Sequence, residues 1–292
     1  RGRSKKRLSE LDTPLEISND TGSFRFISFG SGSSGNCIYI GSDHTHLLVD
    51  AGISNRRIEQ GLNEIGIKGS ELDGVLITHE HHDHISGLQV LTKRFRLPVV
   101  TSGPTGRQLC YRVPFMDDLI RQQEPGTGIQ LGDLWVESFP TPHDAAGSVG
   151  YSITGGGHRV VLCTDLGYVT DQVKQAVRGC DLLVCEANHD EDWVRSGPYP
   201  YHLKARILGD RGHLSNEAGA ELAALAVESG TRQVALAHLS AENNTPSRAR
   251  QTVCRRLSAM GCDPERDIAL WVAPRNEMGP VCQLNREEAV LC

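Results

Sequence analysis

Short apolar runs recur along almost the whole chain, and their lengths and spacing predict strands. Three runs near the start, at residues 24–29, 36–40 and 46–49, are separated by only a few polar residues, as in an antiparallel meander. Further runs of the same kind cover residues 74–77, 134–136, 151–154, 159–163, 182–185 and 233–237. In the second half these runs alternate with helical patterns, so we expect a chain of mixed strands and helices.

Apolar residues at helical spacing predict four helices. In residues 54–65 they share one face, with Ser54 placed to cap the start and Gly66 to end the helix. The other predicted helices cover residues 85–95, 216–228 and 248–260. The first of these begins directly after a polar loop, residues 78–84, which itself follows the strand-like run 74–77. We therefore expect that loop to be held between a strand and a helix.

That loop, residues 78–84, has the sequence THEHHDH and follows a predicted strand. Imidazole and carboxylate groups are ligands that zinc and similar metals accept. In an extended segment His79 and His81 project to the same side, and Asp83 and His84 follow, placed to hold a second ion. A helical metalloprotease motif would need a histidine where Asp83 stands, so that alternative fails. We interpret the loop as a metal site rather than a solvated turn.

Three more candidate ligands lie at or just beyond the ends of later strand-like runs. His143 follows the run at 134–136, Asp165 follows the run at 159–163, and His238 follows the run at 233–237. A single histidine in such a place is usually a packing or capping residue. All three positions lie in strand-end loops, which converge on functional sites, and together they favour a shared centre.

Composition narrows the class of protein. The formal net charge is −6 and hydrophobic residues make up 38% of the chain, which suits a globular protein without a bilayer-spanning run. Nine cysteines without C-x-x-C spacing are typical of reduced thiols, so we expect a cytoplasmic protein. Residues 1–22 are polar and charged and are predicted to be a mobile extension, and residues 23–292 are predicted to be one domain.

The ordered ligand positions resemble those of the metallo-β-lactamase superfamily. The resemblance implies an α+β fold, a four-layer αββα sandwich in a single domain, with two divalent metal ions, zinc or manganese. It also implies a role for each ligand. One ion would be held by His79, His81 and His143, the other by Asp83, His84 and His238, with Asp165 bridging. Asp50, just after the run at 46–49, resembles the carboxylate that orients the ligands from behind.

Two features resemble the YycJ/WalJ-like branch of that superfamily, a branch of single-domain nucleases: the Gly/Ser loop at residues 28–36, and residues 198–210 with the segment 212–216 that follows them. Glu186, in segment 185–189, and His213 resemble the Glu–His pair of members that process the 3′ ends of transfer RNA. Asp165 counts against true β-lactamases and His81 against flavodiiron proteins. Too few residues separate Asp165 from His238 for the domain that β-CASP nucleases insert there.

The resemblance implies a dinuclear-metal-dependent phosphodiesterase, an exonuclease acting on single-stranded DNA or RNA ends through a metal-bridging hydroxide. His213 would be the proton donor and Glu186 its orienting partner, with Glu186→Ala less damaging than His213→Ala; Asp83 is the third expected catalytic residue. Expected substrate contacts are Ser33, Ser34, Asn36, Lys204 and Arg206. Basic side chains must act locally, because the chain as a whole is acidic.

Alternatives remain open at the sequence level. The same centre could serve a glyoxalase-II-like thioesterase or a lactonase. A non-catalytic regulatory scaffold is the third alternative; missing ligands would favour it, and none of the expected ligands is missing. The Gly/Ser loop could be a phosphate-binding nest or an ordinary hairpin turn. No membrane contact is expected. The role of His189, the choice of DNA over RNA, the polarity of cutting, the native metal and the oligomeric state are not indicated.

Overall fold

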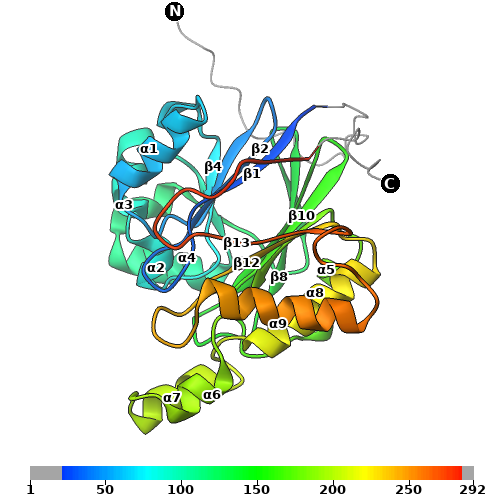
Figure 1. Cartoon of the computed structure of the whole chain (residues 1–292). Coiled ribbons are helices and arrows are strands. Elements are labelled where there is room, and N and C mark those ends of the chain that lie inside the picture. The colour runs from blue at the N-terminus through cyan, green and yellow to red at the C-terminus, as the bar shows by residue number, and fades with distance from the viewer. Residues whose placement is uncertain (1–21, 285–292) are drawn as a thin grey trace, which may run out of the picture.

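The computed structural model describes residues 22–284 as two seven-stranded sheets packed face to face (Figure 1). The first sheet has the order β14 (Cys282–Leu284), β1 (Phe24–Gly30), β2 (Cys37–Gly41), β3 (His46–Val49), β4 (Gly74–Leu76), β5 (Val99–Thr101) and β6 (Ile120–Gln122). The second has the order β13 (Ala269–Val272), β12 (Gln233–Ala237), β11 (Leu182–Glu186), β10 (His158–Cys163), β9 (Val149–Gly155), β8 (Leu134–Pro140) and β7 (Gly128–Leu131).

Each sheet is antiparallel on one side and parallel on the other. Strands β1, β2 and β3 pair antiparallel, and β3 to β6 continue in parallel. In the second sheet β7 to β10 are antiparallel, and β10 to β13 are parallel. The carboxyl ends of parallel strands meet at one edge of a sheet, so side chains far apart in sequence are brought together there.

Helices cover both outer faces, which gives the expected four layers (Figure 1). The helices are α1 (Asn55–Glu64), α2 (His82–Ile85), α3 (Leu88–Phe95), α4 (Gly103–Arg112), α5 (Asp171–Val177), α6 (Glu191–Ser196), α7 (Tyr201–Leu208), α8 (Asn216–Glu228) and α9 (Pro246–Ala259). Short 3₁₀ turns occupy Gly69–Glu71 and Pro114–Asp118. Among the described residues, no helix has the length and apolarity that crossing a bilayer requires.

Apolar side chains fill three layers. The layer between the sheets joins residues of both, such as Phe26 and Leu47 with Tyr151 and Val160. A second layer packs the first sheet against α1, α3 and α4, and a third packs the second sheet against α5, α8 and α9. Buried cysteines, among them Cys163, belong to these layers. The sandwich therefore rests on aliphatic and aromatic burial over both faces of each sheet.

The predicted strands are present within one or two residues, except that β8 extends four residues beyond the predicted run 134–136. The helix predicted at 85–95 is wrong as a single element. The chain forms a short α2 and then α3, with Ser86 and Gly87 between them. The carbonyl of Asp83 accepts from Asn36 N (2.8 Å), and Gly87 N donates to Ala51 O (2.8 Å). Backbone groups that would continue one helix are thus used by neighbouring loops.

Helices α6 and α7 form an arm that projects from the body of the molecule (Figure 1). We call residues 191–208 the arm. No residue of α7 is buried, whereas α8, which follows it, is largely buried. The predicted extension at residues 1–22 lies, apart from Gly22, outside the described residues.

Candidate metal and catalytic site

Strand ends place the candidate site residues along one edge of the two sheets. Asp50 follows β3, Asp165 follows β10 and His238 follows β12. Of the four non-glycine residues in the range 22–284 with left-handed backbone, three are these, with φ of 59°, 60° and 56°. Such a conformation costs roughly 1–3 kcal/mol for a residue with a side chain. The fold holds three site residues in strained turns, which is common where side chains must be aimed.

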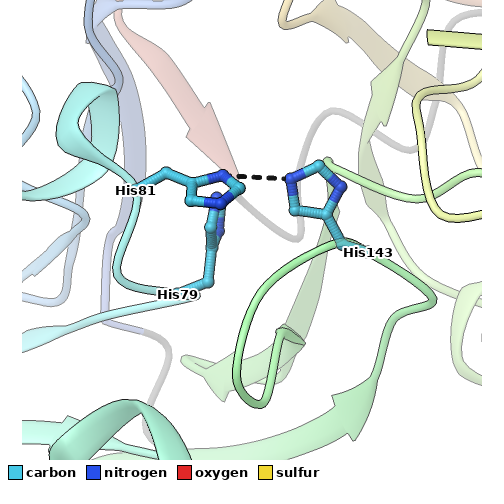
Figure 2. A group of neighbouring side chains, drawn as sticks. All are labelled: His79, His81 and His143. Carbon is cyan, nitrogen blue, oxygen red and sulfur yellow. Dashed lines mark hydrogen bonds between the residues drawn. The ribbon is translucent and has the colours of Figure 1, made fainter. Parts of the chain in front are cut away.

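Three histidines converge at the first ligand group, as Figure 2 shows. His79 and His81 come from the loop after β4, and His143 comes from the loop between β8 and β9. His81 Nδ1 and His143 Nε2 face each other at 3.2 Å. His143 Nδ1 donates to the Gly212 carbonyl (3.0 Å), so its Nε2 presents a lone pair. Lone pairs gathered in this way are the donor set of a metal ion.

The second ligand group contains Asp83, His84 and His238. Asp83 Oδ2 lies 3.5 Å from His84 Nε2 and 3.4 Å from His238 Nε2. Asp165 lies between the two groups, with Oδ2 3.3 Å from His84 Nε2 and Oδ1 3.7 Å from His143 Nε2. All seven predicted ligands are therefore brought together, and Asp165 contacts members of both groups.

Asp50 stands behind this centre, as expected. Its carboxylate accepts from His84 Nδ1 (2.7 Å), from Thr78 N (2.9 Å) and from the Thr78 hydroxyl. Burial alone would lower the pKa of His84, but the Asp50 and Asp165 carboxylates raise it to about 9. The two carboxylates therefore create a negative electrostatic potential at this buried position, and such a potential favours a positive charge there.

Two buried atoms test whether a metal fits. Within the described part of the chain, His79 Nε2 and Asp165 Oδ2 have no hydrogen-bond partner. Burial, followed by four neighbouring imidazoles, lowers the pKa of His79 well below its ordinary value, so the ring is neutral. The Thr78 hydroxyl donates to Asp50 and accepts from His79 Nδ1 (3.0 Å), which leaves a lone pair on Nε2. Buried acceptors without partners are costly unless a cation satisfies them. The residues present therefore fit divalent metal.

Glu186 and His213 form the predicted pair. His213 Nδ1 donates to Glu186 Oε1 (2.9 Å), and the His213 side chain is 22% exposed. Burial works against the charged imidazole, but Glu186 and then Asp165 raise the pKa of His213 above its ordinary value. His213 can therefore present a proton on Nε2 to the open side of the site.

Glu186 has more partners than the sequence indicated. The same Oε1 lies 2.9 Å from His238 Nδ1, and Oε2 accepts from Leu166 N and Leu214 N, both at 3.1 Å. Burial would raise the pKa of Glu186, but the His213 and His238 imidazoles hold it well below its usual range. This carboxylate thus joins the candidate proton donor to a candidate metal ligand.

An open cavity of about 440 Å³ gives access to the centre. Ser33 and Arg206 line it, together with Asp83 and His213. Sequence analysis did not assign several other residues that line it, namely Asp144, Asn188, Tyr199, Leu203 and Glu242. We call this space the site cavity.

Three expected substrate contacts lie elsewhere. Asn36 is buried; its Oδ1 accepts from Gly32 N (2.9 Å) and its Nδ2 lies 3.1 Å from His84 Nε2. Ser34 is exposed and hydrogen bonds to Asn276, away from the lining of the site cavity. Lys204 lies on the arm and donates to the Arg195 carbonyl (2.7 Å). Of the Gly/Ser loop, Ser33 is the predicted contact that reaches the site cavity.

Several positioning residues were missed. The Ser31 hydroxyl accepts from His238 N (2.9 Å), and Asn188 Nδ2 donates to the His238 carbonyl (2.8 Å). Asp144 pairs with Arg206, Nε to Oδ2 at 2.5 Å. Ser31 and Asn188 lie inside segments that the sequence singles out, and Asp144 follows the candidate ligand His143. Which side chain turns towards the centre depends on tertiary structure. His189 is buried beside Asn188 and belongs to none of the ligand groups.

Comparisons with known proteins agree with this geometry. A family model described as the β-lactamase superfamily domain matches residues 45–239. Exodeoxyribonuclease YycJ of Bacillus anthracis is 38% identical over 239 residues, which cover 81% of this chain and 90% of the relative. Exodeoxyribonuclease WalJ of Streptococcus pneumoniae is 39% identical, covering 80% of this chain and 88% of the relative.

Solved structures show the same fold at lower identity. The metallo-β-lactamase fold protein YhfI of Bacillus subtilis superposes with a TM-score of 0.66 at 19% identity, covering 90% of this chain and all of that one. The short form of human tRNase Z has a TM-score of 0.59 at 18% identity, covering 88% of this chain and 99% of that one. Fold, ligand order and whole-chain similarity agree, and the chain belongs to the β-lactamase superfamily, in the group of the YycJ and WalJ proteins.

Proposed function

We propose that the protein is a metal-dependent exonuclease that hydrolyses phosphodiester bonds at single-stranded ends of DNA. The observation that carries the proposal is the Glu186–His213 pair, which sits beside two metal-ligand groups in one open cavity. The naming of relatives that cover most of the chain as exodeoxyribonucleases supports DNA over RNA. The buried thiols suit a reducing compartment, and we place the enzyme in the cytoplasm.

Two divalent ions, zinc or manganese, would be held by the two ligand groups, with Asp165 shared. When bound, they would supply positive charge beside the scissile phosphate and lower the pKa of a coordinated water. The chain itself contributes the pairing that orients the ligands, through Asp50 to His84 and through the Gly212 carbonyl to His143.

His213 would protonate the leaving oxygen of the strand. Its pKa is raised by Glu186, its side chain is partly exposed, and it lines the cavity that a strand end would enter. Asp83 also lines the cavity. Burial would raise the pKa of Asp83, but the His238 imidazole holds it well below its usual range, so the carboxylate is ionised and suited to orient the attacking water.

Ser33 and Arg206, which both line the site cavity, would hold the phosphate. A guanidinium is the side chain best shaped for a phosphate, and the Ser33 hydroxyl can donate to a phosphate oxygen. A thiolate leaves an acyl carbon without protonation, so a thioesterase would have little use for His213. This difference in leaving groups favours the nuclease over the thioesterase.

The test uses end-labelled single-stranded DNA with metal-reconstituted protein. We expect stepwise loss of terminal nucleotides, no cutting of a circular single strand, and loss of activity with a chelator. An acyl thioester and single-stranded RNA serve as competing substrates under the same conditions. Cleavage of the circle at the rate of the linear strand would exclude an exonuclease, and faster thioester hydrolysis than strand cleavage would favour the acyl hydrolase.

A further inference from the structure

The arm carries a second cavity next to the site cavity. It has a volume of about 390 Å³ and is lined by Arg195, Tyr199, Tyr201, Lys204, Ala205 and Leu208. Tyr199 lines both cavities, so the two adjoin at this residue. We call this second space the outer cavity. Its size is within the range of small-ligand sites, and a strand that leaves the site cavity past Tyr199 would enter it.

The residues that line the outer cavity are those that bind unpaired nucleotides. Two tyrosine rings offer faces for stacking, and the charged lining residues in this described part of the chain are both cations, Arg195 and Lys204. Lys204 uses one of its three donors on the Arg195 carbonyl, so two remain for phosphate oxygens. Cations gathered around aromatic rings form a platform for single strands, and the chain as a whole carries a net charge of −6.

Core packing does not explain these side chains. Tyr201 is 87% exposed, and none of α7 is buried. The arm is instead fastened to the body at its edges, through Arg206 to Asp144 and through Trp193, which packs beneath Arg248 with 4.4 Å between guanidinium and ring. Exposure alone does not set Tyr201 apart, because Tyr111 is exposed to the same extent. Tyr201 differs in lining a cavity that also contains a second tyrosine and two cations, which is a surface suited to stacking a ligand.

We propose that the outer cavity is a nucleotide-binding subsite, in which Tyr201 and Tyr199 stack the unpaired bases next to the cleaved end while Lys204 and Arg195 hold their phosphates. This rests on the proposed function of the site cavity. Stacking reads no particular base, so the subsite would select for unpaired strands of sufficient length rather than for sequence.

The test measures kcat and KM of the metal-loaded protein on oligothymidylates of two to ten nucleotides. In the wild type we expect KM to fall with length until the strand reaches the outer cavity. Tyr201→Ala should raise KM for the longest strand roughly 5- to 100-fold, and Tyr201→Phe, which retains the ring, should keep the wild-type value. Tyr111→Ala is the matched control, since Tyr111 is 86% exposed on α4 and lines neither cavity.

Two outcomes would overturn the subsite. One is an unchanged KM of Tyr201→Ala at every length; the other is an equal rise of KM for the dinucleotide, because then Tyr201 would support the site cavity rather than bind distant bases. Binding of labelled ten-nucleotide strands is followed in parallel by fluorescence anisotropy. Binding that depends on Tyr201, without any cleavage, would contradict the exonuclease and support the subsite. Cleavage that does not depend on Tyr201 would support the exonuclease and contradict the subsite.

Discussion

At the scale of single residues, the division of labour between His213 and Glu186 can be measured. His213→Ala should leave metal content intact and lower turnover on natural strands by roughly 10²–10⁴-fold, the usual size of a general-acid contribution. A nitrophenolate leaving group needs little protonation, so hydrolysis of a thymidine nitrophenyl phosphodiester should lose far less. Equal losses on both substrates would mean that His213 positions phosphate or supports the fold.

Glu186 is expected to behave differently, because its carboxylate contacts both His213 and His238. Glu186→Ala should lower metal content as well as turnover and should cost at least as much activity as His213→Ala. The sequence-based expectation of a smaller loss is thereby revised. Elemental analysis of the two purified variants measures the metal content of each. Full metal content in Glu186→Ala would mean that Glu186 only orients His213 and does not support metal binding.

Ligand residues could be predicted from sequence because few residue types bind metal and because His79, His81, Asp83 and His84 lie within one short segment. Residues that position them could not. Asn188 and Ser31 are ordinary polar residues until the fold brings them against His238 from distant strands. The left-handed turn at His238 also has no local sequence cue such as glycine or asparagine.

At the scale of elements, the loop after β3 is predicted to depend on one glycine. A Cβ at Gly52 would lie 1.6 Å from the carbonyl oxygen of Asp83, and Gly52 N donates to Asn36 O (2.7 Å). Gly52→Ala should therefore displace the ligand loop, destabilise the fold by about 1–3 kcal/mol and weaken metal binding.

Thermal unfolding and metal titration would measure both effects. Gly22→Ala is the matched control, because the nearest atom to a Cβ there is 3.8 Å away, an ordinary contact. A Gly52→Ala protein with wild-type melting temperature and metal affinity would show that the loop can shift without loss.

Prediction at this scale worked where patterns were long and failed where they were short. The aliphatic strands around β10 to β12 and the helix α8 were placed from periodicity alone. Three-residue strands such as β5 and β6 are too short for a period to emerge. The arm has no buried stripe on α7, so no apolar pattern marked that helix.

At the scale of the whole molecule, the metal content and the stability are linked. We expect two divalent ions per chain, with Asp165→Ala losing at least one because that carboxylate contacts both ligand groups. Chelation should lower the melting temperature, since an ion bound only by the folded chain stabilises it by mass action. One ion or none in active protein, or a melting temperature indifferent to chelator, would contradict this.

Each ligand group takes members from both halves of the chain. His79 and His81 follow a strand of the first sheet and lie beside His143, which follows a strand of the second. In the same way, Asp83 and His84 lie beside His238. The polypeptide passes from the first sheet to the second once between β6 and β7, through the exposed residues Glu124 and Pro125. A backbone nick at that crossing would leave two pieces whose reassembly the ions themselves would promote. Zinc or manganese added to the separated pieces would then act as an assembly switch, with regained nuclease activity as its reporter.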